Sequence, residues 1–127
     1  MVRNEHDLQV SIIDRIKLYE PQYPELTLLH AIPNGGQRHK AIAVKLKAEG
    51  VKAGVPDLCL PVARNGFHGF YRELKTKTGT MRASQKMWLR ALEKNGYSVG
   101  VCRDVDQAVI EIVSYVRGPK TEVLTDA

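Results

Sequence analysis

The sequence predicts an α/β domain in which helices flank both faces of a mixed central β-sheet. Segments with apolar residues at helical spacing alternate with short apolar runs of strand length. The predicted order is helix, strand, helix, a hairpin pair of strands, helix, strand and helix. The hairpin, at the turn signal of residues 64–66, supplies an antiparallel pair, whereas strands separated by helices are typical of α/β domains.

The first half of the chain predicts a helix, a strand and a second helix. Asn4 is a capping residue for a helix that begins at Glu5. An apolar run predicts a strand over residues 26–32, which the turn signal of residues 33–36 ends. The second helix is expected over residues 38–49. The residues of these two helices expected to face the core are Leu8, Ile12, Ile16, Tyr19, Ile42, Ala43 and Leu46.

The second half supplies the hairpin and two further helices. Apolar runs at residues 57–62 and 67–75 predict the two hairpin strands. A polar loop leads to a helix over residues 83–95, and a buried strand over residues 97–102 follows. Asp104 caps the last helix, with a glutamine three residues further on. Together these elements complete a sheet with helices before, between and after its strands.

The composition is typical of one soluble domain. The chain has 127 residues, of which 43% are hydrophobic. We expect a single domain over residues 1–117 and a loose polar tail over residues 118–127. No apolar run reaches the roughly 18–20 residues of a membrane span, and the charged N-terminus is unlike a secretory signal. The cysteines and histidines lack zinc-ligand spacing. We therefore expect a cytoplasmic protein without zinc.

Basic charge is concentrated in the middle of the chain. Between Arg38 and Lys94 there are thirteen Lys and Arg against four Asp and Glu, a net charge of +9. The rest of the chain has a net charge of −4, within an overall charge of +5. This distribution fits a phosphate-binding face. A solvated basic surface explains it equally well.

Three ionisable residues around the hairpin predict a reactive centre. Glu73 and Lys75 are two positions apart on a strand, so their side chains leave the same face. Asp57 begins the preceding strand, and the hairpin can bring it beside Glu73. Unpaired burial of such charges costs several kcal/mol, which a Mg²⁺ or Mn²⁺ ion would offset with oxygen ligands that include the backbone carbonyl of Leu74. The alternative for Glu73 and Lys75 is an ordinary surface ion pair.

Glu5 and Gln85 are polar residues on otherwise apolar helix stripes. Glu5 precedes the core-facing stripe of the first helix, and Gln85 shares a helix face with Trp88. Polar groups that face inward need polar partners, which a shared site would provide. Two simpler interpretations remain open: an acid favoured by the helix macrodipole for Glu5, and a first-turn side chain in water for Gln85.

These motifs resemble a known family. Pro56-Asp57, Glu73-Leu74-Lys75 and Ser84-Gln85, in that order, resemble the PD-(D/E)xK nuclease superfamily. Glu5, residues 33–36 and residues 54–57 extend the likeness, and the chain resembles the VRR-NUC (virus-type replication-repair nuclease) family, in its stand-alone viral type. The resemblance runs from Glu5 to about residue 116.

The resemblance implies a PD-(D/E)xK nuclease core and phosphodiester hydrolysis that depends on Mg²⁺ or Mn²⁺. It implies that Asp57 and Glu73 are metal ligands and that Lys75 is the catalytic lysine. It implies that Glu5 and Gln85 are supporting polar groups of the same catalytic site.

Stand-alone members of this family act as homodimers on four-way junctions, whereas members fused to larger repair proteins act on flaps. The resemblance therefore implies a Holliday junction resolvase that works as a homodimer on branched DNA, without a membrane. If its source is viral, as the resemblance to the stand-alone type implies, we expect it in the host-cell cytoplasm. Three alternatives are a flap or single-strand nuclease, a non-catalytic DNA-binding module, and an α/β domain unrelated to DNA. The segment 34–38 is either a phosphate-binding loop or a plain connection. The expected DNA contacts are Lys77, Arg82, Lys86, Arg38 and Lys40.

Overall fold

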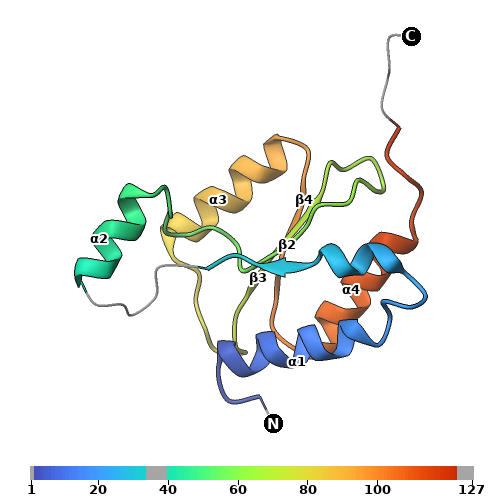
Figure 1. Ribbon diagram of the computed structural model, residues 1–127, viewed down its shortest axis with the longest axis horizontal. Coiled ribbons are helices and arrows are strands. Elements are labelled where there is room, and N and C mark those ends of the chain that lie inside the picture. The colour runs from blue at the N-terminus through green and yellow to red at the C-terminus, as the bar shows by residue number, and fades with distance from the viewer. Residues whose placement is uncertain (1, 34–39, 123–127) are drawn as a thin grey trace.

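The computed structural model describes residues 2–33 and 40–122, which form a four-stranded mixed sheet with helices around it (Figure 1). The strand order is β1-β2-β3-β4, with β1 and β2 antiparallel, β2 and β3 antiparallel, and β3 and β4 parallel. The strands are β1 (His30–Ala31), β2 (Leu58–Leu60), β3 (Phe70–Leu74) and β4 (Ser98–Cys102). This confirms the predicted mixed sheet.

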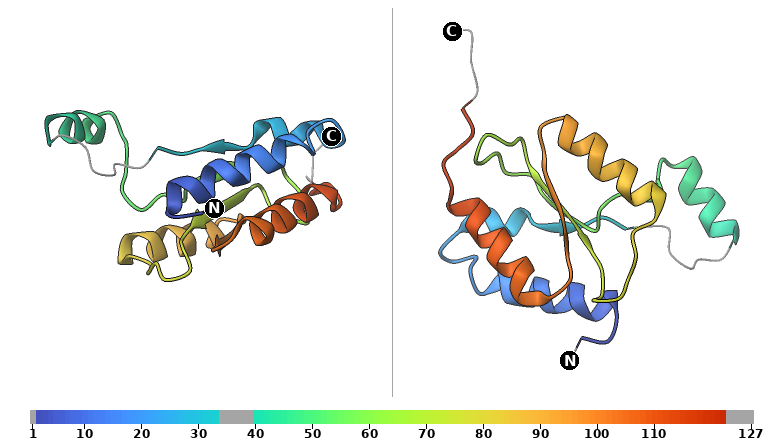
Figure 2. Two further views of the ribbon diagram at one scale, coloured as in Figure 1. Left: turned by 90° about the horizontal axis from the view of Figure 1, so that it is seen from below. Right: turned by 180° about the vertical axis from the view of Figure 1, so that it is seen from behind.

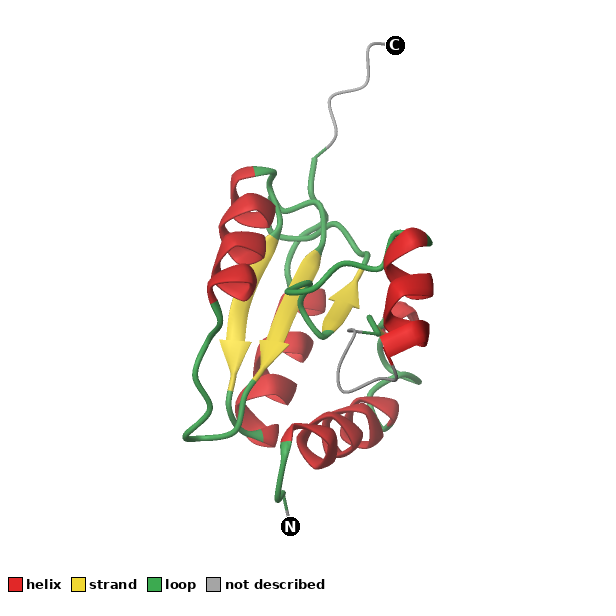
Figure 3. Ribbon diagram, turned by 90° about the vertical axis from the view of Figure 1, so that its left-hand side faces the viewer, coloured by secondary structure: helices red, strands yellow, loops and turns green. Residues whose placement is uncertain are grey.

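Helices cover both faces of this sheet. Figure 3 shows α3 (Ala83–Lys94) in front of the strands and α4 (Val105–Arg117) behind them, and both contact β4. The first helix, α1 (Glu5–Lys17), packs against α4 at one end of the sheet. Its expected cap is present, since the Asn4 side chain accepts a hydrogen bond from the backbone of Asp7 at 2.8 Å. The prediction that helices flank both faces of the sheet is therefore confirmed for α3 and α4.

The main core lies between the sheet and the helices α1 and α4. Alternate residues of β3 point to opposite faces, so Phe70 and Leu74 enter this core while Glu73 faces the α3 side. Leu8 and Ile12 of α1 meet them there, both fully buried. The acidic residue of β3 thus lies on the sheet face opposite the main core.

The strand expected over residues 26–32 is mostly wrong. The structure has a 3₁₀ helix, η1 (Pro24–Leu28), with Pro24 at its start, and a strand of only two residues, His30–Ala31. Proline fits the first helical position because its missing N–H has no partner to lose there. The Thr27 hydroxyl donates to the Pro24 carbonyl at 2.7 Å, which further favours the turn. The apolar run identified a packed segment but not its backbone conformation.

The second helix, α2 (Lys40–Ala48), forms, but its apolar face is not in the core. Ile42 is 50% exposed, Ala43 is exposed and Leu46 is only partly buried. Figures 1 and 2 show α2 standing apart from the sheet and the other helices. The apolar pattern predicts a helix face that favours burial, but it does not show whether that face packs against this domain or against another surface. The predicted turn at residues 33–36 and the helix start at residue 38 extend into residues outside the described part of the chain.

The beginning of the expected C-terminal tail is attached to the hairpin. The backbone N–H of Asn65 donates to the Pro119 carbonyl at 2.8 Å, and that of Thr121 donates to the Ala63 carbonyl at 3.3 Å. Asn65 has a φ of 58° in the predicted hairpin turn. Residues 119–121 therefore run beside residues 63–65 and are joined to them by backbone hydrogen bonds. No helix among the described residues is long and apolar enough to cross a membrane.

Candidate active site

Three acidic residues from separate elements converge at one end of the sheet. Carboxylate oxygens of Glu5, Asp57 and Glu73 all lie within 4.8 Å of one another. Glu5 comes from the first turn of α1, Asp57 immediately precedes β2, and Glu73 lies on β3. The antiparallel pairing of β2 with β3 sets Leu58 opposite Arg72, which brings Asp57 beside the end of β3. The geometry thus places the predicted carboxylates in one cluster.

Asp57 is fixed by the backbone of the neighbouring strand. Its Oδ2 accepts a hydrogen bond of 2.7 Å from the N–H of Leu74. A short bond from a backbone donor to a carboxylate orients the group strongly. The same bond brings Leu74 to the edge of the cluster.

Glu73 is the buried member of the cluster. Its side chain is 1% exposed, and Oε1 accepts a hydrogen bond of 3.1 Å from the Gln85 side-chain amide. Oε2 has no hydrogen-bond partner among the described residues. Burial, followed by the nearby Asp57 carboxyl, raises the pKa of Glu73 to about 9, although Lys75 acts in the opposite direction. A buried carboxylate with one free oxygen beside two other acids fits a divalent cation.

Gln85 holds Glu73 from α3. Its Oε1 accepts from the backbone N–H of Arg82 at 2.9 Å, so its amide nitrogen is the group turned to Glu73. An amide whose oxygen is already occupied cannot flip without losing both bonds. The structure therefore excludes a Gln85 side chain in open water. It places this residue beside the carboxylates, as the inward-facing interpretation expects.

Lys75 is 5% exposed and follows directly after β3. Its backbone N–H donates to the Cys102 carbonyl of β4 at 3.0 Å, which continues the pairing of the two strands. The loop after it folds against the side chain, since a Cβ atom added to Gly79 would lie 3.5 Å from Lys75 Cδ. Strand alternation places the buried Lys75 side chain on the same side of β3 as Glu73, and its positive charge acts against the rise of the Glu73 pKa.

The proposed DNA contacts are spread more widely than the carboxylates. Lys77 is exposed in the loop after Lys75, and Arg82 and Lys86 are exposed at the start of α3. Lys40 is exposed on α2, and Arg38 lies outside the described residues. The structure thus groups three of the five basic residues next to the elements of the acidic cluster.

The sequence analysis did not identify three basic residues that the structure places in notable positions. Arg90 and Lys94 continue the line of Lys86 along α3 at i,i+4 spacing, beside a shallow groove of about 410 Å³. Helical spacing could have revealed that line. Arg103 reaches from the end of β4 to the loop after Lys75. A single arginine between a strand and a helix cap has no periodic signal in the sequence.

The sequence model of the VRR-NUC domain matches residues 3–106. The chain belongs to the VRR-NUC family. Solved structures similar to it include a VRR_NUC domain protein with a TM-score of 0.78 and 25% sequence identity, which covers 97% of this chain and 99% of that one. No curated protein matches the sequence.

The matched residues of the VRR-NUC domain contain the whole cluster, from Glu5 on α1 to Gln85 on α3. The fold, a mixed sheet with helices on both faces, is consistent with the PD-(D/E)xK core that this nuclease family shares. The match ends in the first turn of α4, so the rest of that helix and the segment packed on the hairpin extend beyond it.

Proposed function

We propose that this VRR-NUC domain is a Mg²⁺- or Mn²⁺-dependent endonuclease that hydrolyses phosphodiester bonds in branched DNA, with Holliday junctions as its main substrate. One observation carries the proposal: three carboxylates converge beside a buried lysine, and a buried oxygen of Glu73 lacks a partner among the described residues. Family membership favours a nuclease. The choice of the four-way junction follows the resemblance to stand-alone members of the family.

In this proposal Glu5, Asp57 and Glu73 hold one or two divalent cations, together with the backbone carbonyl of Leu74. Oxygen ligands of this kind suit Mg²⁺ and Mn²⁺. A bound cation of this type lowers the pKa of a coordinated water and offsets charge on the phosphate. The protein's own contribution is to bring the oxygens together and to keep Glu73 oriented through Gln85.

Lys75 acts on the reacting groups directly in this proposal. Its buried side chain lies on the side of β3 that carries Glu73, so its ammonium group can orient the attacking water or donate hydrogen bonds to the phosphate as negative charge builds. The basic residues Lys77, Arg82 and Lys86 bind neighbouring phosphates of the DNA backbone. Arg38 and Lys40 extend this contact towards α2.

We also propose that the enzyme acts as a homodimer. Resolution of a four-way junction needs paired cuts in two strands, and a two-fold dimer carries two equivalent sites. The exposed apolar side chains of Ile42 and Val44 on α2, 50% and 64% exposed, favour contact with a second copy.

Cleavage of defined DNA substrates tests the proposal. Wild type, Asp57→Ala and Lys75→Ala are incubated with labelled four-way junctions, flaps, single strands and linear duplex, each with Mg²⁺, Mn²⁺ or EDTA. We expect wild type to cut the junction only with a divalent ion. Asp57→Ala should lose cleavage, and Lys75→Ala should lose cleavage but still bind the junction. Asp14→Ala, which removes an exposed acid of α1, is the matched control and should cut like wild type.

The substrate panel also separates the alternatives. Preferential cutting of flaps or single strands would replace the junction by the flap or single-strand substrate while keeping the site. Salt-dependent binding without cleavage under any metal condition would indicate a non-catalytic DNA-binding module. Equal cleavage by wild type and Asp57→Ala would show that the site is assigned to the wrong residues.

A further inference from the structure

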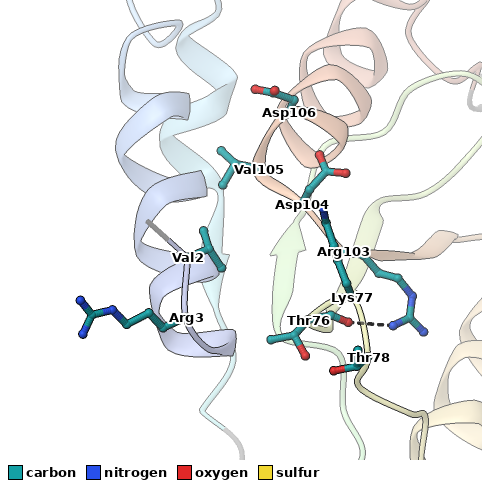
Figure 4. A pocket seen from close by; sticks show the side chains of 9 residues that line it. All are labelled: Val2, Arg3, Thr76, Lys77, Thr78, Arg103, Asp104, Val105 and Asp106. Carbon is teal, nitrogen blue, oxygen red and sulfur yellow. Dashed lines mark hydrogen bonds between the residues drawn. The ribbon is translucent and has the colours of Figure 1, made fainter.

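Arg103 connects the end of β4 to the loop that follows Lys75. Its Nη1 donates to the carbonyls of Thr76 and Gly79, each at 2.8 Å. Figure 4 shows the guanidinium reaching to the Thr76 carbonyl, beside the cavity that the loop helps to line. Two short bonds from one charged donor group to two backbone carbonyls restrain the loop at both its first residue and its turn.

The restrained loop in turn contacts Lys75. The N–H of Gly79 donates to the Thr76 carbonyl at 3.2 Å and closes a tight turn. This turn lies against the lysine, since a Cβ on Gly79 would be 3.5 Å from Lys75 Cδ and 3.2 Å from Thr76 Oγ1. The loop therefore packs against the aliphatic part of the Lys75 side chain, and the hydrogen bonds from Arg103 fix the position of the loop.

Arg103 is itself anchored at the junction of β4 and α4. Its backbone N–H donates to Gln107 Oε1 at 3.2 Å, and the Gln107 side chain also donates to Glu111 at 2.8 Å. The residue before it, Cys102, accepts the backbone N–H of Lys75. The end of β4 is thus bonded to Lys75 through the Cys102 carbonyl and to the loop of residues 76–79 through the Arg103 side chain.

We propose that Arg103 is a positioning residue, which keeps the loop of residues 76–79 against Lys75 so that the lysine ammonium stays at the acidic cluster. The proposal rests on the proposed function. A lysine side chain has four rotatable bonds and no rigid plane of its own. Without the loop packed against it, the Lys75 side chain gains conformers in which the ammonium is displaced. A displacement of about 1 Å costs roughly 10²-fold in rate.

Two substitutions test this role by kinetics. Arg103→Gln should lower kcat by about tenfold or more, because a neutral side chain that is shorter cannot bridge both carbonyls. Arg103→Lys keeps the charge and one donor group, so it should recover part of the lost kcat. Affinity for the junction, measured in EDTA, should fall no further than in Lys77→Ala, which removes the cation of the same loop.

Arg64→Gln is the matched control. Arg64 is also half-buried and also donates to backbone carbonyls, those of Ala63 and Val116, but it lies at the hairpin. Its loss should reduce the free energy of unfolding without a change in kcat of the folded enzyme. A decrease in kcat of the same size for Arg64→Gln and Arg103→Gln would overturn the positioning role, because it would show a general effect of lost stability.

Hydrogen exchange provides a readout that does not depend on cleavage. In Arg103→Gln the amides of residues 76–80, Gly79 above all, should exchange at least about tenfold faster, whereas those of β3 and α4 should be unchanged. Unchanged exchange in this loop, or faster exchange with an unchanged kcat, overturns the proposal. If wild type itself cuts no DNA, the proposed function fails and the positioning role fails with it. If wild type cuts and Arg103→Gln has the same kcat, only the positioning role fails.

Discussion

Glu73 combines near-complete burial with two acidic neighbours, and these raise its pKa to about 9 from an ordinary value of 4.5. At pH values between the two, the folded protein keeps the proton that the unfolded chain has lost. The contribution of Glu73 to stability is therefore fully present below about pH 4.5 and is lost as the pH rises towards 9. The negative charge of the Glu73 carboxylate lowers the free energy of unfolding of the metal-free protein. A bound cation would be attracted by the same charge.

Glu73→Gln should remove this pH dependence. Glutamine keeps the size of the side chain and carries no charge, so the metal-free variant should melt several degrees above wild type at pH 8 and close to it at pH 4.5. About 1 kcal/mol corresponds to roughly 3–6 °C for a domain of this size. Thermal unfolding in EDTA over this pH range measures the effect.

The exposed Glu93 supplies the control for that experiment. Glu93→Gln should leave the pH dependence of the wild-type Tm unchanged. Added Mg²⁺ should raise the Tm of wild type and leave that of Glu73→Gln nearly unchanged, since ligand binding to the folded state stabilises it. A variant with a Tm equal to or below that of wild type at pH 8 would contradict the assigned cost of the buried carboxylate.

At the scale of elements, the loop that carries Asp57 is packed directly on α3. A Cβ atom on Gly54 would lie 2.8 Å from the backbone carbonyl of Ser84, and the φ of Gly54 is +91°. The Trp88 indole on the same helix donates to the Ala53 carbonyl at 3.1 Å. The next residue after Ser84 is Gln85, which holds Glu73. One contact between a loop and a helix therefore sets the relative position of two carboxylates.

Gly54→Ala should damage both stability and activity. The added methyl group meets backbone that cannot move aside, and the left-handed conformation is strained for alanine, so we expect a loss of about 1–3 kcal/mol. Gly50→Ala is the matched control, because its φ is also positive, at +99°, but no atom lies within 4 Å of the added Cβ. Urea unfolding and junction cleavage measure both variants. Cleavage lost equally in the two would mean that backbone strain, and not the displacement of Asp57, is responsible.

The opposite face of β3 carries a second charged pair. Arg72 is 8% exposed in the apolar face, and its Nε donates to Glu111 Oε1 of α4 at 2.9 Å. The guanidinium carbon also lies 3.8 Å from the centre of the Phe70 ring. This pair joins β3 to α4 from behind, while Gln85 and Glu73 join β3 to α3 from the front.

Glu111→Ala should destabilise the domain by about 2–4 kcal/mol, because it leaves the buried Arg72 charge without its carboxylate. Urea unfolding of the single variants and of the double variant with Arg72→Met gives the coupling between the two residues. We expect the double variant to lose less stability than the sum of the single variants. Additive losses would show that the ion pair contributes nothing beyond packing.

The elements that could be predicted are those whose signals are local. Asn4 and Asp104 cap α1 and α4 as expected. The 64–66 turn lies within the connection of residues 61–69, so the two hairpin strands are shorter than expected, but their antiparallel pairing still brings Asp57 to Glu73. The segment 26–32 was assigned wrongly because an apolar run does not distinguish a strand from a packed 3₁₀ turn.

The wider parts of the site depend on distant packing. Glu5 and Gln85 reach the cluster only because α1 and α3 meet β3 from different sides, and periodicity alone left simpler interpretations of both. Family resemblance indicated them where local physics did not. Neither periodicity nor the family resemblance indicated Arg103, because its proposed role depends on contacts with a loop that forms only in the folded protein.

At the scale of the whole molecule, α2 is a helix that does not pack into the core of the domain. It stands apart in Figures 1 and 2, and none of its described side chains is buried. An isolated helix of nine residues is marginal in water, so contact with another surface would stabilise it. Its lysines could attract DNA, but its exposed Ile42 and Val44 gain most from an apolar partner.

The double substitution Ile42→Glu with Val44→Glu should therefore convert a wild-type dimer to a monomer. Residues two positions apart lie on different faces of a helix, so the two substitutions place a carboxylate in the contact whichever of the two residues it uses. In an apolar contact between like subunits, such a carboxylate is desolvated and repels its counterpart. Sedimentation at micromolar concentration measures the mass, and a junction on a supercoiled plasmid reports paired cuts as linear product and single cuts as nicked circles. We expect the variant to produce nicks.

Ile110→Glu, which changes an apolar residue on α4 with 65% exposure, should leave the mass and the paired cuts unchanged. A variant that remains dimeric but binds junctions less tightly, with a shallower salt dependence, would assign α2 to DNA instead, and a monomeric wild type would exclude the homodimer altogether.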